Sequence, residues 1–146
     1  MEDSDRSRAR RTVEEIVASD AMMRQFGIVV EDADVGRVVL SMMLTPNMAN
    51  THGIAHGGAL FTLADSAFGC AAATGAVPHL ANHCHISFLA PGPLGEQVYA
   101  TAEERFREGR NGMYDVSVRR ADGSVIAELR GWSRELPAGM RRQGTD

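Results

Sequence analysis

The 146-residue sequence contains no lysine, because all 15 of its basic residues are arginine. This absence excludes Schiff-base chemistry and catalysis by a lysine general base. Cysteine is also scarce: only Cys70 and Cys84 occur, both in apolar contexts, and no secretory signal is recognised. We therefore expect two buried free thiols in a reducing compartment, and a cytoplasmic protein.

The signatures of several common enzyme classes are missing as well. There is no G-x-S-x-G motif of a serine hydrolase, and no glycine-rich motif that binds dinucleotides or phosphates. The net charge of −4 gives no basic surface of the kind that binds nucleic acids. Residues 57–75 invite a membrane-spanning interpretation, but Asp65 lies among them and such a helix tolerates aspartate poorly. We interpret this stretch as a helix buried inside a soluble fold.

The overall composition, with 44% hydrophobic and 23% charged residues, is ordinary for one globular domain. Both ends of the chain are polar and rich in arginine. We predict mobile tails over residues 1–10 and 138–146, and a single domain over residues 11–137. Because the tails contain few apolar residues, we also expect that both can be removed without loss of stability.

The spacing of apolar residues predicts a helix, two strands, one long helix and four further strands. Tight turns between the last three strands predict an antiparallel meander. The long helix is apolar on nearly all sides, so it must be covered, and an antiparallel sheet is the available cover. We therefore predict an α+β fold in which a curved antiparallel sheet wraps around one long central helix. The predicted helices are 12–25, with a capping box at Thr12 and Glu15 and an end at Gly27, and 57–74; the strands are 28–31, 37–45, 80–90, 97–107, 113–120 and 124–135.

The motif His56-Gly57-Gly58 precedes and opens the long helix. The first N–H groups of a helix are unpaired and carry a positive partial charge, and glycine lets a ligand approach the backbone closely. Such a helix start can bind an anion or a developing oxyanion. The two glycines can equally serve only to permit a sharp turn into the helix, and the spacing alone leaves both interpretations open.

Asp65 lies in the middle of the same helix among apolar residues. A carboxylate in this position costs desolvation free energy unless it is paired or faces a cleft, and no arginine of the helix can pair with it. One alternative is a structural aspartate that is satisfied by a hydroxyl or a backbone group of another strand. We favour a functional role, because residues that break local rules inside a well-formed element tend to mark sites.

The spacing of these two candidates predicts an oligomer. Gly57 and Asp65 are eight residues apart, which is about 12 Å along a helix at 1.5 Å per residue. A reacting carbon must lie about 3 Å from both its base and its oxyanion donor. One chain cannot place both groups on one carbon, so a site that uses both must be shared between two subunits.

Three further sets of residues have less specific patterns. Asn50 and His52 can orient a substrate or hold their loop through hydrogen bonds of the Asx type. His83 and His85 face the same side of a strand, but no third ligand has a suitable spacing, which disfavours a metal site. Three arginines near the 109–112 hairpin can meet phosphates or lie at a solvated strand end; they are Arg105, Arg107 and Arg110.

The run from Asn50 through His56-Gly57-Gly58 to Leu63-Ala64-Asp65-Ser66-Ala67-Phe68 resembles the hotdog-fold thioesterases, in particular the PaaI type of phenylacetic acid degradation. The likeness extends from about residue 26 to residue 134. It includes the segments Phe88-Leu89-Ala90-Pro91-Gly92 and Tyr114-Asp115-Val116. The combined pattern is fairly specific to the family, but it is not specific for one acyl group.

This resemblance implies a hotdog fold, an active site at a subunit interface, and hydrolysis of acyl-coenzyme A thioesters with no metal and no cofactor. It implies that Asp65 is the general base on water or the nucleophile, and that the Gly57 N–H binds the thioester carbonyl. Asn50 and His56 correspond to supporting polar groups near the thioester. Relatives often carry a serine on the strand after the long helix, where this chain has Ala81 with Asn82 beside it.

Together, the residues and the resemblance predict an acyl-CoA thioesterase for aryl-acetyl substrates such as hydroxyphenylacetyl-CoA. We expect Gly58, Asn82 and Arg110 to contact the substrate. We expect a homodimer at least, and a homotetramer built as a dimer of dimers, with no nucleic-acid or membrane partner. The alternatives are an acyl-thioester hydratase or dehydratase with His56 as base, and a non-catalytic acyl-CoA sensor. A desolvated Asp65 beside a thioester argues against the sensor.

Overall fold

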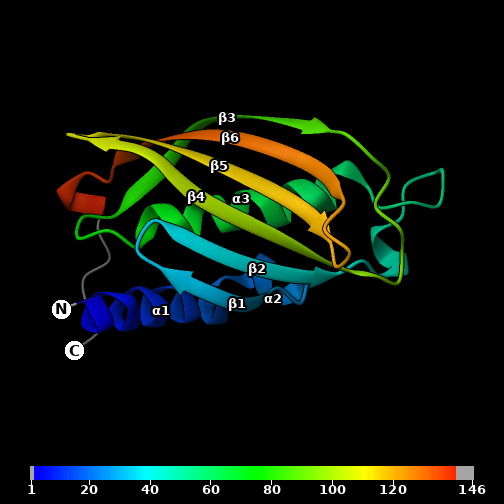
Figure 1. Ribbon diagram of the computed structural model, residues 1–146, viewed down its shortest axis with the longest axis horizontal. Coiled ribbons are helices and arrows are strands. Elements are labelled where there is room, and N and C mark those ends of the chain that lie inside the picture. Colours follow the sequence, from blue (N-terminus) through cyan, green and yellow to red (C-terminus); the bar gives the residue numbers. More distant parts are fainter. Residues whose placement is uncertain (1, 141–146) are drawn as a thin grey trace.

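A computed structural model of the chain describes residues 2–140. Its strands form one antiparallel sheet in the order β1-β2-β4-β5-β6-β3, and this sheet curves around the long helix α3 (Figure 1). The predicted α+β architecture is therefore confirmed. The elements are α1 (Glu2–Ser19), α2 (Ala21–Gln25), β1 (Val29–Asp34), β2 (Arg37–Met43), η1 (Pro46–Met48), α3 (Gly57–Ala73), β3 (His79–Phe88), β4 (Gln97–Glu108), β5 (Asn111–Arg120), β6 (Val125–Glu135) and η2 (Ala138–Met140).

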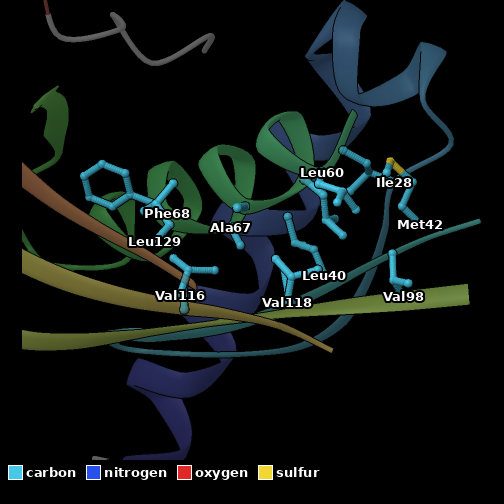
Figure 2. Packing of buried hydrophobic residues seen from close by; sticks show 14 of the residues in the cluster. Ile28, Leu40, Met42, Leu60, Ala67, Phe68, Val98, Val116, Val118 and Leu129 are labelled. Atoms are coloured by element: carbon cyan, nitrogen blue, oxygen red, sulfur yellow. The ribbon is translucent and has the colours of Figure 1, made fainter. Parts of the chain in front are cut away.

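The core lies between α3 and the concave face of the sheet. Figure 2 shows Leu60, Ala67 and Phe68 on the helix, with aliphatic side chains of several strands directed toward them. The alternation predicted for the second strand is confirmed, since Val38, Leu40, Met42 and Leu44 are all fully buried. Burying one such large apolar side chain contributes about 1.5–3 kcal/mol to folding, so this face fixes the register of β2.

A glycine of β6 allows the sheet to approach the helix closely. A Cβ atom added at Gly131 would lie 2.5 Å from Cε1 of the fully buried Phe68. The Phe68 ring also packs against Tyr114 of β5, with the ring centroids 5.4 Å apart. These contacts set the separation between α3 and the centre of the sheet.

The first helix begins much earlier than the sequence predicts. The predicted start at Thr12 and the predicted domain boundary at residue 10 both fall inside α1, so these boundaries are wrong. Ala9 is fully buried, and the Arg6 guanidinium lies 2.9 Å from the carboxylate of Asp32 on β1. The partner of Arg6 is far away in the sequence, which is why local periodicity shows no reason for a helix here. Figure 1 shows α1 running beside β1.

The predicted end of the N-terminal helical region is correct, although the region is divided in two. Asp20 caps α2 by accepting a hydrogen bond from the Met23 N–H at 2.9 Å. Gly27 has a φ of 67°, and the Ile28 N–H donates to the Met23 carbonyl, which together form the glycine-dependent end of a helix. At the other terminus, the predicted tail starts as η2 (Ala138–Met140), and residues 141–146 lie outside the described residues.

β3 forms one edge of the sheet, and among the strands of residues 2–140 it pairs only with β6. Its register shifts between Ala81 and His83, which reverses the alternation of buried and exposed side chains. The prediction that Leu80 is buried is therefore wrong, since Leu80 is 53% exposed. Beyond the shift, Cys84 is partly buried as the alternation predicts. Phe88, at the end of the strand, is also half exposed. An unpaired edge with exposed apolar side chains is typical of an interface with another chain.

Candidate active site

The start of α3 has a backbone donor, the Gly57 N–H, that is not engaged by any of the described residues. The His56 side chain caps the helix, because its Nδ1 atom accepts a hydrogen bond from the Gly58 N–H at 2.8 Å. Gly58 therefore does not offer its N–H to a ligand. No acceptor within residues 2–140 takes the N–H of Gly57. Gly57 is thus the glycine of the pair that can bind a carbonyl oxygen or an oxyanion.

The loop before α3 is folded around the Asn50 side chain. Its Oδ1 atom accepts hydrogen bonds from the His52 N–H at 2.9 Å and from the Ile54 N–H at 3.3 Å. The predicted loop-holding role of Asn50 is therefore correct. The same residue also lines a cavity, so its amide NH2 group is placed near any molecule bound there.

This first cavity has a volume of about 410 Å³ and lies where the loop, the start of α3 and the segment after β3 meet. A Cβ atom at Gly57 would lie only 3.1 Å from Cζ of Phe88, so the Phe88 ring rests on the glycine. Sequence reasoning did not assign Phe88 to the site, because its role depends on where the end of β3 lies relative to α3. The lining residues are Asn50, Ile54, Ala55, Gly57, Leu60, Phe88, Leu89, Ala90, Pro91 and Gly92.

Asp65 is half buried on α3, two helical turns after Gly57, and it does not line the first cavity. No donor among residues 2–140 forms a hydrogen bond or ion pair with its carboxylate, which removes the structural alternative considered from the sequence. Burial raises the pKa of the Asp65 carboxyl above its ordinary value. The Cys84 thiol has a raised pKa because of burial and, secondly, because the Asp65 charge is near. Asp65 therefore lies on the side of α3 that faces β3.

These positions divide the predicted catalytic residues into two groups within one chain. Gly57 and Asn50 meet at the first cavity, and His56 supports them as the helix cap. Asp65 lies away from them, near the unpaired edge of the sheet. Within one chain, the Gly57 N–H and the Asp65 carboxylate thus do not meet.

Two of the three candidate arginines are already engaged by the protein. The Arg107 guanidinium donates to the carbonyl oxygen of Ala72 in the last turn of α3, to that of Val77 between α3 and β3, and to the Tyr114 hydroxyl. Arg105 pairs with Asp115 at 3.1 Å. Arg110 is exposed, and its guanidinium has no acidic partner among the described residues.

The histidines of β3 lie against an aromatic side chain. The rings of His83 and His85 are 5.1 and 5.6 Å from the ring of Trp132 on β6. Within residues 2–140, no group of three or more histidine, cysteine or acidic side chains could hold a metal ion. Asn82 borders a second cavity at this end of the sheet. No helix in residues 2–140 is long and apolar enough to cross a membrane.

Comparison with known proteins identifies relatives that cover most of the chain. Residues 52–127 match the thioesterase superfamily. The acyl-coenzyme A thioesterase PaaI of Escherichia coli (strain K12) is 36% identical over 118 residues, which are 81% of this chain and 84% of that protein. The structure of the E. coli PaaI protein from the phenylacetic acid degradation operon superposes with a TM-score of 0.87 and 32% identity, covering 90% and 96% of the two chains. A mutant structure of the phenylacetic acid degradation protein PaaI from Thermus thermophilus superposes with a TM-score of 0.77 and 32% identity. The match covers 80% of this chain and 100% of that chain.

Proposed function

Because the chain belongs to the thioesterase superfamily, we propose that it hydrolyses acyl-coenzyme A thioesters as a PaaI-type enzyme. The observation that carries the proposal is the unpaired, half-buried carboxylate of Asp65 on the same helix as the unengaged N–H of Gly57. Burying an unpaired carboxylate costs desolvation free energy, and no contact in residues 2–140 offsets this cost. A catalytic role explains why the carboxylate is there.

In the proposed reaction, the thioester carbonyl oxygen accepts a hydrogen bond from the Gly57 N–H at the positive end of α3. Asp65 acts as general base and takes a proton from water, whose oxygen bonds to the carbonyl carbon. The tetrahedral intermediate then breaks its C–S bond, and the proton passes from Asp65 to the leaving thiolate. The products are the free acid and coenzyme A. The His56 cap and the Asn50 side chain hold the carbonyl-binding half in place.

The two halves of this site come from different subunits in our proposal. Gly57 and Asp65 are about 12 Å apart along one helix, too far to act on one carbon. Asp65 faces β3, whose outer edge is unpaired and carries the exposed apolar side chains of Leu80 and Phe88. A second copy on this edge would bring its own α3 start toward Asp65. We propose a homodimer as the catalytic unit and a dimer of dimers as the complete assembly.

The apolar lining of the first cavity supports an acyl group with an aromatic ring. Its largest apolar side chains are those of Ile54, Leu60, Phe88 and Leu89. Aromatic rings pack favourably against one another, so Phe88 suits an aryl-acetyl substrate of the hydroxyphenylacetyl type. The relatives associated with phenylacetic acid degradation support the same class of substrate.

The alternative of a hydratase or dehydratase requires His56 as the base. Its Nδ1 atom is occupied by the Gly58 N–H, so only the other ring nitrogen is free for such a role. The most direct experiment is a thiol-release assay over a panel of acyl-CoAs, with the wild type and Asp65→Asn side by side. We expect the wild type to release coenzyme A from aryl-acetyl thioesters and the variant to be nearly inactive. Equal rates for the two proteins would contradict the assignment.

A further inference from the structure

The ring of Phe88 is large, apolar and only partly covered within one chain. A Cβ atom added at Gly57 would lie 3.1 Å from its Cζ atom, so one side of the ring rests on the start of α3. The Phe88 residue is nevertheless 52% exposed, and it lies at the end of β3, an edge strand of the sheet. An exposed aromatic ring at a sheet edge is typical of a contact with another chain.

α3 and β3 run in opposite directions beside the candidate site. Gly57 lies next to Phe88 at one end. At the other end, the register partner of Cys84 is Gly131, which lies against α3 about one turn after Asp65. The eight residues of helix from Gly57 to Asp65 span about 12 Å. The four residues of strand from Phe88 to Cys84 span about 13 Å, so the two elements match in length.

Two-fold symmetry then determines how the β3 edges of two subunits meet. The shared site brings Gly57 of each subunit to Asp65 of its partner, so the symmetry axis passes midway between these positions on α3. The residue midway along the matching part of β3 is Ile86. Two antiparallel β3 strands with Ile86 at the axis place Phe88 of one subunit opposite Cys84 of the other. Directly opposed residues of antiparallel strands face the same side, with Cβ atoms about 4.5–5.5 Å apart.

We propose that the Phe88 ring of one subunit covers the Asp65 carboxylate of the other and shields it from bulk water. This inference rests on the proposed shared site and assigns Phe88 a part in it. Because the ring also lies on Gly57 of its own chain, each site takes Gly57 and Phe88 from one subunit and Asp65 from its partner. Within one chain, Phe88 is about 13 Å along β3 from Cys84, the residue near Asp65, which is too far to cover that carboxylate.

The proposed cover makes Asp65 a stronger base. Burial disfavours the charged carboxylate, and it already raises the pKa of Asp65 within one chain. The ring of the partner subunit adds to this effect, and a base with a pKa closer to the working pH accepts a proton more readily. The nearest other ionisable groups are Cys84 on β3 and, across the interface, His56 of the partner subunit, which caps the start of α3. Phe88 therefore acts through Asp65, as a positioning residue.

The pH dependence of kcat/KM tests this role. Phe88→Ala should move the acid midpoint to lower pH by about one unit, a modest part of the roughly three to five units that full burial can cause. Phe88→Leu, which keeps an apolar cover, should move it less. Phe106→Ala removes a phenylalanine that is 47% exposed on β4, which β5 and β6 separate from β3, and should leave the midpoint unchanged. His56→Asn should also keep the midpoint, since asparagine can cap the helix. A Phe88→Ala protein that loses activity equally at every pH would overturn the proposal.

Titration of the Asp65 carboxyl by carbon-13 NMR gives a readout that needs no turnover. The Asp65 signal is the one that Asp65→Asn lacks, and its pKa should fall in Phe88→Ala dimers. Phe88→Leu provides the same comparison if the alanine variant does not form dimers. A lowered pKa together with no thiol release from any acyl-CoA would contradict the proposed function and support the contact. An unchanged pKa in dimers confirmed by native mass spectrometry would overturn the contact.

Mixed dimers identify the subunit that supplies the ring. One chain carries Asp65→Asn and its partner carries Gly57→Pro, so the one working site uses Gly57 of the first chain and Asp65 of the second. Adding Phe88→Ala to the first chain should lower the acid midpoint, and adding it to the second chain should not. The opposite result would overturn the proposal, because each ring would then act on Asp65 of its own chain. Mixed dimers without activity would contradict the shared site itself, and with it this proposal.

Discussion

Replacing Gly57 with alanine tests the contact between the start of α3 and the end of β3. The added Cβ would lie 3.1 Å from Cζ of Phe88 and 3.4 and 3.5 Å from two further ring atoms. Carbon atoms are most favourably placed at about 3.5–4.0 Å, so the Phe88 ring must move by about 0.5 Å. The φ angle of Gly57 is not in the positive region, so the backbone accepts alanine without strain.

The expected cost to stability is small. Within one chain Phe88 is half exposed, so its ring can shift more easily than a side chain in the packed core. Alanine also lowers the entropy cost of forming the helix, by up to about 0.5–1 kcal/mol relative to glycine. We therefore expect the free energy of unfolding to change by less than about 1 kcal/mol, which a thermal or urea melt will measure.

The expected cost to activity is larger, because the displaced ring lines the cavity that receives the thioester. A misplacement of about 1 Å can cost about a hundred-fold in rate, so a shift of half that size should lower kcat/KM about ten-fold. In a Phe88→Leu background the added methyl group meets a smaller side chain, so Gly57→Ala should lower kcat/KM by less than about three-fold. Thiol-release kinetics on the four proteins give the result. An equal loss in both backgrounds would refute the contact as the cause.

Three further perturbations test other parts of the molecule. Asp65→Asn should lower kcat by about a hundred- to ten-thousand-fold, as expected for loss of a general base. Burial raises the pKa of Asp65, so protonation of this carboxyl stabilises the folded state. This contribution to the free energy of unfolding is fully present below the pKa of the unfolded state, and it is lost as pH rises through the pKa of the folded state. The variant should therefore be at least as stable as the wild type at neutral pH, while wild-type kcat/KM should rise with a midpoint above 3.8; a lower midpoint would count against Asp65 as the base. Deleting residues 2–10 should lower the Tm by about 4 °C or more, since it removes the buried Ala9, and an unchanged melt would argue that this part of α1 adds nothing. Gly131→Ala should cost about 1–3 kcal/mol or more in a urea titration, because its Cβ would overlap the buried ring of Phe68, and Phe68→Leu should relieve part of that cost.

The fold was predictable where local pattern and packing agree. The predicted buried faces follow from the alternation of Val38, Leu40 and Met42 and from the apolar surface of the 57–73 helix. The same faces are buried in the structure. The early start of α1 was not predictable from pattern, because residues such as Arg6 are held by carboxylates on β1 that are distant in sequence. Leu80 was misplaced because the shift in register before His83 reverses the alternation, and nothing in the local sequence marks it.

Some residues of the candidate site could likewise be predicted from the sequence, and others could not. Asp65 and Gly57 could be recognised because each departs from what its position in a helix requires. Phe88 could not, since its position beside Gly57 depends on how the end of β3 packs on α3, and these segments are far apart in the chain. The role of Arg107 could not be predicted either, because the carbonyls of Ala72 and Val77 to which it donates are about 30 residues away in the chain.

The most direct test of the shared site is subunit complementation between two inactive variants. Asp65→Asn lacks the base, and Gly57→Pro lacks the donor N–H at a helix position that tolerates proline. His56 is already in extended backbone conformation, as a residue before proline prefers, although the proline ring will press on Phe88 and the fold of this variant must be checked first.

Equal amounts of the two variants are unfolded and refolded together, and mixed dimers are counted by native mass spectrometry. With random pairing half of the dimers are mixed, and each mixed dimer holds one intact site of two. The account predicts recovery to roughly a quarter of wild-type activity. Mixed dimers that stay as inactive as their parents would contradict it, because each site would then draw both groups from a single chain.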